Sequence, residues 1–235
     1  MQSGKIASVG TFVGVILADV VRSRSRDDFR VLRDTALNEL SERHLDRRWI
    51  ETRYAVTAWD EFQVVLRAPR HAADVLWSIR LAFHPLRVRI GIGFGIAEVS
   101  RTDPTPINVS ATGDAFVRAR RALQSIHNGK DTRFEPITHA DTGDAETDLT
   151  VNTVLHLLDL VVDRVTPSQW EAILAYERLG RQDRVAEFLG KDESTISRAL
   201  KRAAYWYIRE SHVALGSVLD RALPRYRRAG TEERT

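Results

Sequence analysis

Hydrophobic and polar residues in the first third of the chain follow two periods, one typical of strands and one typical of helices. Residues 11–18 are almost continuously apolar, as expected of a strand buried on both faces. Apolar residues recur every three or four positions over 26–45 and over 69–83, which predicts two amphipathic helices. Between these helices, residues 49–57 and 61–66 are rich in β-branched and aromatic side chains and predict a hairpin.

A strict period of two characterises residues 87–99, where large apolar side chains alternate with Gly91, Gly93 and Gly95. Glycine weakens a strand interior unless another part of the protein approaches closely, so we expect a helix to cover this bare face. A third helix is predicted over 111–126 and a last edge strand over 132–138. This order of strands and helices is that of a ferredoxin-like sheet with its helices on one face.

The rest of the chain, from residue 148 onward, has the pattern of helix alone. Just before it, acids and glycine with little apolar content indicate a linker. The expected fold class is therefore α+β, a ferredoxin-like sheet domain followed by an all-α domain. The expected boundaries are a flexible N-terminus over 1–10, the sheet domain over 11–139, a linker over 140–148, the helical domain over 149–224 and a basic tail over 225–235.

Composition narrows the class of protein. The chain has 235 residues, 43% of them hydrophobic and 29% charged, which is typical of a folded protein with two units. It contains no cysteine, which excludes disulfides, thiolate zinc sites and a cysteine nucleophile. The longest apolar run is shorter than the ~18 residues of a membrane span, and the order of a secretory signal is absent. We expect a cytoplasmic protein with no membrane partner.

Residues 181–203 are the most informative stretch, because they resemble the helix-turn-helix of many bacterial regulators. Ala186 is small enough for two helices to cross closely, and Gly190 supplies the turn between them. At about 100° per residue, Ile196 and Leu200 share one face of the second helix. We expect these two side chains to anchor it.

The opposite face of the same helix is short-polar and basic, and it carries no acid. Serine and threonine near a helix start can reach base edges or phosphates, arginine can pair with guanine, and lysine suits phosphates. The alternative is an ordinary amphipathic helix with a solvated basic face. Residues 151–235 carry 14 basic and 12 acidic residues, a net charge of +2, so attraction to DNA must be local. The residues expected to contact double-stranded DNA are Lys191, Ser194, Thr195, Arg198, Lys201 and Arg202.

Two carboxylates of the first segment are candidates for metal chemistry. Asp19 ends the first strand and Asp60 lies at the turn of the hairpin. Such residues can converge on one side of a sheet and hold Mg²⁺ ions that bridge a nucleotide triphosphate. The alternative is local, since aspartate side chains commonly cap turns.

Four separated blocks of the first segment resemble the SatD family, which is in turn similar to class III nucleotide cyclases and GGDEF-type diguanylate cyclases. The resemblance covers most of residues 11–138 and implies a nucleotide-cyclase-like sheet in which Asp19 and Asp60 bind metal. By motif position it implies that Arg121 neutralises phosphate charge. The blocks are LADVVRSR from residue 17, WDEFQ from 59, RIGIGFG from 89 and GDAFVRAR from 113.

The chain also departs from the cyclase-like pattern. Trp59 replaces the glycine before the hairpin aspartate, Val117 replaces an asparagine, Ala18 replaces a glycine, and Arg22 stands where SatD proteins usually have an acid. We therefore expect degraded catalytic motifs, no enzyme activity and no required cofactor. The resemblance leaves a candidate nucleotide-binding set of Asp19, Arg24, Trp59, Asp60 and Arg121, with Mg²⁺ as a candidate ion on Asp19 and Asp60.

These observations together predict a DNA-binding transcriptional regulator of bacterial type. Its degenerate cyclase-like domain is expected to sense a nucleotide, with a cyclic dinucleotide as one candidate effector, or to mediate dimerisation. Excess apolar residues over 155–162 and 205–223 favour a homodimer, because paired DNA half-sites need two-fold symmetry. The alternative is an active metal-dependent nucleotidyl cyclase with DNA-coupled output.

Overall fold

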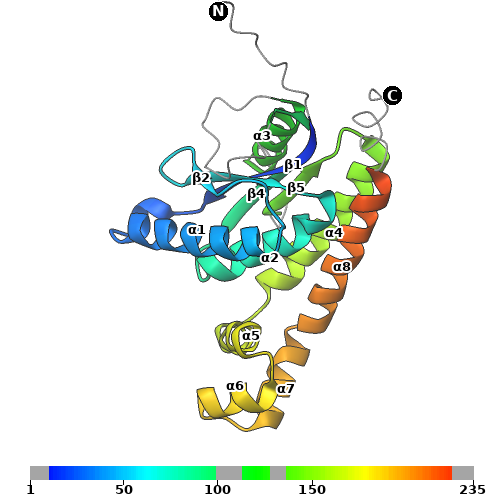
Figure 1. Ribbon diagram of the computed structural model, residues 1–235. Coiled ribbons are helices and arrows are strands. Elements are labelled where there is room, and N and C mark those ends of the chain that lie inside the picture. Colours follow the sequence, from blue (N-terminus) through cyan, green and yellow to red (C-terminus); the bar gives the residue numbers. More distant parts are fainter. Residues whose placement is uncertain (1–10, 99–112, 128–135, 224–235) are drawn as a thin grey trace, which may run out of the picture.

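A computed structural model describes residues 11–98, 113–127 and 136–223. The fold is mixed α+β and mostly helical, built on a five-stranded mixed sheet (Figure 1). The strands are β1 (Thr11–Val20), β2 (Ala55–Val56), β3 (Glu61–Leu66), β4 (Val88–Ala97) and β5 (Thr138–Asp141). The α-helices are α1 (Phe29–Asp46), α2 (Ala72–Phe83), α3 (Asp114–His127), α4 (Ala145–Asp163), α5 (Pro167–Leu179), α6 (Gln182–Leu189), α7 (Glu193–Arg202) and α8 (Tyr205–Ala222), with short 3₁₀ turns η1 (Ser23–Ser25) and η2 (Pro69–His71).

The sheet has the order β2-β3-β1-β4-β5, with the apolar strand β1 at its centre. β1 pairs antiparallel with both β3 and β4, whereas β5 runs parallel to β4. The register places Asp19 of β1 opposite Glu61 of β3 and opposite Arg89 of β4. Charged residues from three adjacent strands therefore meet near one end of the sheet.

Helices cover both faces of the sheet, so the expectation of helices on one face is wrong. Ile16 of β1 packs in one core with α1 and α2, whereas Leu17 packs in a separate core with α3. The glycine row of β4 explains the position of α3. A β-carbon on Gly93 would lie 2.1 Å from the backbone nitrogen of Ala119, so the helix backbone rests directly on the strand. The predicted close cover of this face is confirmed.

The C-terminal helices α4 and α8 are part of the same core as the sheet. Val151 and Leu155 of α4, with Leu215 and Leu219 of α8, pack with the apolar residues of β1, α1 and α2. Figure 1 shows α4 and α8 running beside the α2 side of the sheet. One hydrophobic core therefore extends across the expected boundary between the two units.

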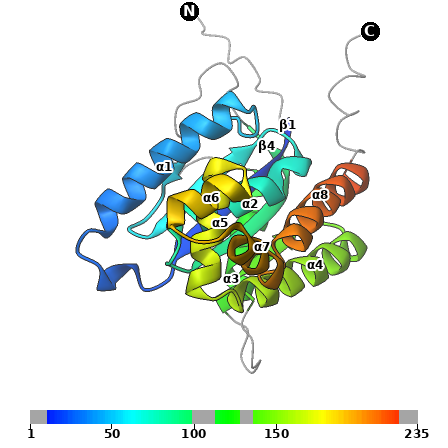
Figure 2. The ribbon, with the colours of Figure 1, turned by 90° about the horizontal axis from the view of Figure 1, so that it is seen from below.

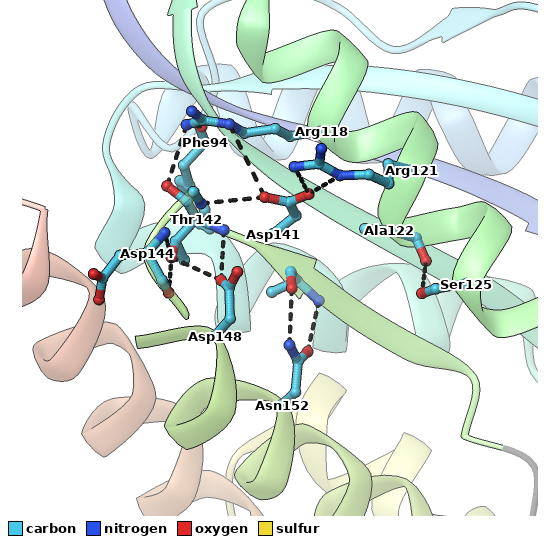
Figure 3. A network of polar contacts seen from close by, with 12 residues as sticks. Phe94, Arg118, Arg121, Ala122, Ser125, Asp141, Thr142, Asp144, Asp148 and Asn152 are labelled. Atoms are coloured by element: carbon cyan, nitrogen blue, oxygen red, sulfur yellow. Dashed lines mark hydrogen bonds and ion pairs between the residues drawn. The ribbon is translucent and has the colours of Figure 1, made fainter. Parts of the chain in front are cut away.

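Residues 140–148, expected to form a linker, instead make a hydrogen-bonded junction between β5 and α4 (Figure 3). Asn152 of α4 exchanges two hydrogen bonds with the backbone of Ala140, at 2.7 and 2.8 Å. Asp148 accepts from the backbone N–H of Thr142 at 2.6 Å and from its hydroxyl at 2.7 Å. Short polar side chains here satisfy backbone groups rather than solvate a loose segment, which composition alone does not distinguish.

Two expected strands also differ from the structure. Of residues 49–57 only Ala55 and Val56 form a strand, because Trp49 stacks on His71 and Tyr54 is buried in the core. The last strand begins at Thr138, at the end of the expected range. Residues 132–135 lie outside the described residues, as do the expected N-terminus over 1–10, the start of the third helix at 111–112 and the basic tail over 225–235.

Helices α5, α6 and α7 form a further layer beyond α2, on the side away from the sheet (Figures 1 and 2). Trp77 of α2 connects this layer to the rest, because its ring stacks on Trp170 of α5 with centroids 5.9 Å apart. In the part of the chain that the structure describes, no helix is both long and apolar enough to cross a membrane.

Candidate nucleic-acid interface

Helices α6 and α7 are joined by a turn of three residues, 190–192. Gly190 begins this turn with φ of 61°, a left-handed conformation that glycine adopts without steric cost. Ala186 of α6 and both predicted anchors of α7, Ile196 and Leu200, are buried in one cluster with α5. The predicted turn at Gly190 and the predicted burial of Ile196 and Leu200 are therefore confirmed.

The outward face of α7 is polar and basic. Ser194, Arg198, Lys201 and Arg202 are exposed, while Thr195 is half-buried. The guanidinium of Arg198 donates to the backbone oxygen of Ser194 at 3.1 Å and to Oγ1 of Thr195 at 3.3 Å. These are exposed local bonds, so the same donors can exchange them for acceptors on a ligand.

Two acidic residues lie at the start of α7. Asp192 occupies the N-cap position, without a capping hydrogen bond to its side chain, and Glu193 occupies the first turn, where negative charge is stabilised by the helix dipole. The ammonium of Lys191 is paired with the carboxylate of Glu171 on α5. Lys201 and Arg202 have no acidic partner among the described residues. Of the four cations among the six predicted residues, Lys191 therefore contributes the least uncompensated charge.

The two candidate metal ligands lie near the same end of the sheet. The backbone N–H of Val20, next to Asp19, donates to the backbone oxygen of Asp60 at 3.0 Å. Oδ2 of Asp19 lies 3.7 Å from the guanidinium of Arg89. Oδ2 of Asp60 accepts from the buried hydroxyl of Ser23 at 3.1 Å. Each carboxylate is thus engaged by its own neighbour.

Trp59 and Arg24 belong to the same end of the molecule. The Trp59 side chain is 47% exposed, and its ring lies 6.2 Å from that of Phe29. Its backbone oxygen accepts from the buried guanidinium of Arg33 at 2.5 Å. Arg24 is exposed on η1, which is separated from the end of β1 by two residues. Asp19, Trp59 and Asp60 therefore lie at one end of the sheet, and the binding of a nucleotide by these residues and Arg24 stays a prediction.

Arg121 does not join this group. Its Nε donates to Oδ2 of Asp141 on β5 at 2.5 Å, at the opposite edge of the sheet from β3 (Figure 3). Arg118 of the same helix donates to the backbone oxygen of Phe94 at 2.5 Å. Arg121 thus holds α3 to β5, and its charge is compensated there.

The cation that reaches the carboxylate end is the preceding residue, Arg120, which sequence reasoning missed. Its guanidinium donates to both carboxylate oxygens of Glu61, the register neighbour of Asp19. Burial of Glu61 by itself raises the pKa, but hydrogen bonds from Arg120 and Thr57 outweigh it and hold the pKa below its ordinary value. Adjacent residues on a helix point about 100° apart. An alignment of α3 to the family motif that is shifted by one residue therefore predicts Arg121 where the structure has Arg120.

A divalent metal finds no complete ligand set in this part of the chain. Within residues 11–98, 113–127 and 136–223, no group of three or more His, Asp or Glu side chains is arranged to hold an ion. At this end of the sheet, Arg89 and Arg120 compensate the negative charges of Asp19 and Glu61, respectively.

The chain was compared with known families and with curated proteins. The sequence model of the SatD family matches residues 11–217. No curated protein matches the chain. The matched range extends well beyond the expected residues 11–138 and includes α6 and α7, so the two helices lie within the family's own sequence.

Proposed function

The chain belongs to the SatD family, and we propose that this member is a DNA-binding transcriptional regulator that reads double-stranded DNA with α7. The observation that carries the proposal is the outward face of that helix. It presents Arg198, Lys201 and Arg202 without a facing acid, next to exposed serine. A face of this composition suits phosphates and guanine edges in the major groove.

The geometry of α6 and α7 adds support. A short helix, a glycine turn and a second helix anchored by two buried aliphatic side chains are the parts of a helix-turn-helix. The layer of α5, α6 and α7 also stands away from the sheet, so a duplex has open access to α7 (Figure 1).

The sheet end is proposed to be a degenerate nucleotide-cyclase-like unit. The order β2-β3-β1-β4 with α1 and α2 on one face supports a ferredoxin-like arrangement for these elements. Arg89, Ser23 and Arg120 already engage Asp19, Asp60 and Glu61, respectively. This compensation favours a role in nucleotide sensing or assembly over catalysis.

Exposed apolar side chains on α4 and α8 support a homodimer. Leu149 and Leu157 of α4 and Tyr207 and Val213 of α8 are each more than half exposed. Large apolar side chains on neighbouring helices can contribute to an interface between two copies, and we infer that α4 and α8 do so here. Two-fold symmetry would pair two copies of α7 for successive half-sites.

The test of the DNA proposal is binding of the purified protein to genomic fragments, measured by fluorescence anisotropy against random competitor. Arg198→Ala is expected to lose about 1–3 kcal/mol on the selected site and less on random duplex, because a bidentate base contact carries specificity. Arg221→Ala, an exposed substitution at the far end of α8, is the control and should leave binding unchanged. Equal losses on both duplexes would contradict the role of Arg198. No preference for any fragment would contradict the proposal itself.

The shared position of Asp19 and Asp60 at one sheet end favours a second candidate, a metal-dependent nucleotidyl cyclase. Incubation of the protein with GTP or ATP and Mg²⁺ or Mn²⁺, followed by chromatography of the nucleotides, tests it. If the protein makes a cyclic product and Asp19→Ala abolishes it, the sheet unit is a cyclase rather than a sensing or assembly unit. Absence of product from both nucleotides with both metals would dismiss this candidate.

A further inference from the structure

A cavity lined by α1, α2, α5 and α8 lies away from both sites considered above. It has a volume of about 650 Å³ and separates the α1–α2 layer from α5 and α8. A ligand cavity of a few hundred to about a thousand cubic ångströms accommodates a molecule of nucleotide size. Its walls therefore enclose enough space for a small organic anion.

Four arginines line this cavity from three helices and the loop after α1. Arg43 and Arg47 lie one helical turn apart at the end of α1, and Arg178 lies across from them near the end of α5. Within the described residues none of these three makes an ion pair with an acid. Arg47 instead lies over the ring of Trp49, 4.8 Å from its centroid. The fourth, Arg209 of α8, pairs with Asp74 at 3.5 Å.

Three acids also line the cavity, so its walls carry four arginines and three carboxylates, a net charge of +1. Asp74 pairs with Arg209, and Oε1 of Glu177 accepts from the indole N–H of Trp77 at 2.7 Å and from the hydroxyl of Tyr205 at 3.0 Å. These two donors of Glu177 are uncharged and do not neutralise its carboxylate, and Glu39, one turn before Arg43 on α1, is the third acid. Positive charge is therefore in excess on the walls, and three of the guanidinium groups have no ion-pair partner among the described residues.

We propose that this cavity binds a small phosphate-bearing anion, held by Arg43 and Arg47 from α1 and by Arg178 from α5. A phosphate offers acceptors to several guanidinium groups at once, and such charge-assisted hydrogen bonds are the strongest available on these walls. A nucleotide, a sugar phosphate and inorganic pyrophosphate share this chemistry.

The position of the cavity makes its occupant a regulator of α7, a consequence that rests on the proposed DNA-binding function. One wall belongs to the α1–α2 layer and the other to α5, which packs directly on α6 and α7. A ligand that bridges the two walls favours one spacing of α5 from the sheet unit over others. If DNA also binds one spacing of α5 more tightly than the others, the ligand's preference among these spacings changes the affinity of α7 for DNA.

Calorimetric titration of the full chain with sodium pyrophosphate, GTP and glucose 6-phosphate tests the site, at fixed ionic strength and without divalent metal. Saturable binding of at least one probe is expected. Arg43→Met and Arg178→Met should each weaken it by about tenfold or more, since each removes hydrogen bonds to a charged group. Glu39→Gln should strengthen it, because it removes one of the negative charges on the wall. The three probes distinguish a bare phosphate requirement from recognition of a base or a sugar.

Two controls locate the binding. Arg164→Met removes an exposed arginine at the end of α4 and should leave affinity unchanged. Asp60→Asn tests the sheet end as the alternative location of binding. Binding that Asp60→Asn weakens while Arg178→Met does not, or no saturable binding of any probe, would overturn the proposal.

The consequence for DNA is measured separately, as anisotropy of a duplex with and without saturating probe. A change of about fivefold or more in DNA affinity is expected, absent in Arg178→Met. If Arg178→Met weakens DNA binding with no probe present and duplex competes with pyrophosphate, the arginines are DNA contacts and the proposal fails. If the probes bind as expected but no duplex is recognised, the site stands and the proposed DNA function fails.

Discussion

Two regions of this molecule hold arginine in opposite ways. Between α2, β5 and α4, the guanidinium of Arg80 is buried and paired with Asp159, with the side chains 6% and 1% exposed. On the outer face of α7, Arg198, Lys201 and Arg202 are exposed and face no acid. The contrast shows which cations the fold uses to hold itself together and which remain for a ligand.

The interior region is a network rather than a single pair. Arg80 also donates to the hydroxyl of Thr138 at 2.6 Å, and Asp159 accepts the backbone N–H groups of Ile137 and Thr138 at 2.9 and 2.8 Å. Through it, α2, α4 and the start of β5 are fixed together. A buried charge in such a network is tolerated only while its partner is present.

The largest expected effect comes from breaking this pair from one side. Asp159→Asn keeps the side-chain shape but leaves the Arg80 guanidinium buried without a counter-charge, so the free energy of unfolding should fall by about 3–5 kcal/mol. Chemical denaturation followed by circular dichroism measures it. The double variant Arg80→Met with Asp159→Asn is the matched control: it removes the buried cation and keeps an amide oxygen for the backbone N–H groups of Ile137 and Thr138, so it should cost less than Asp159→Asn alone. A loss below that of an ordinary surface substitution would show that the pair does not hold these elements together.

Shape in the interior is as restrictive as charge. The β-carbon of Gly93→Ala would meet the α3 backbone at 2.1 Å, so strand and helix must separate, at a cost of about 1–3 kcal/mol. Val117→Ala, on the exposed side of α3, is the control and should change little. Thermal unfolding of both variants checks this. Equal stabilities would contradict the close contact of α3 with β4.

These cases show what the sequence could and could not predict. Alternation with glycine predicted a covered face, because close approach requires the absence of a β-carbon, but the pattern did not say which face carried α1 and α2. The buried face of α7 followed from the spacing of Ile196 and Leu200, since helical periodicity is a local property. The Arg80–Asp159 pair joins residues 79 positions apart, and no local pattern connects them.

The candidate sites follow the same rule. The basic face of α7 could be predicted because it depends on one helix. The neighbours of Asp19 could not, because Arg89 and Arg120 reach it or its partner Glu61 only through sheet register and the position of α3. The arginine cavity combines α1, α5 and α8, so it becomes visible only in three dimensions.

A smaller effect is expected from His212, which is buried beneath Trp77 with centroids 5.5 Å apart. Burial lowers its pKa to about 3, with the charges of Arg80 and Arg209 adding to the shift. Because the native pKa lies below the ordinary 6.5, the unfolded chain binds more protons between these values, and stability falls as pH decreases through that window. From pH 7 to pH 5 this group should cost about 2 kcal/mol.

Denaturation of the wild type and of His212→Leu across this pH range tests the effect. His44, whose pKa burial also lowers to about 3, contributes in the same direction, so the variant should retain part of the pH dependence. A variant as sensitive to acid as the wild type would contradict a neutral buried His212.

The smallest effect on stability is expected for substitutions on α7. Because its cations are exposed and face no acid, their removal is expected to weaken DNA binding rather than the fold. Lys201→Ala removes an exposed cation with no acidic partner among the described residues, so the free energy of unfolding should change by less than about 0.5 kcal/mol. Its affinity for every duplex should fall, and the dependence of log affinity on log salt should flatten by about one. Lys191→Ala should weaken DNA binding less, because its ammonium is already paired with Glu171. Anisotropy at several salt concentrations measures both variants, and a larger loss for Lys191→Ala than for Lys201→Ala would show that charge compensation does not decide which cations bind DNA.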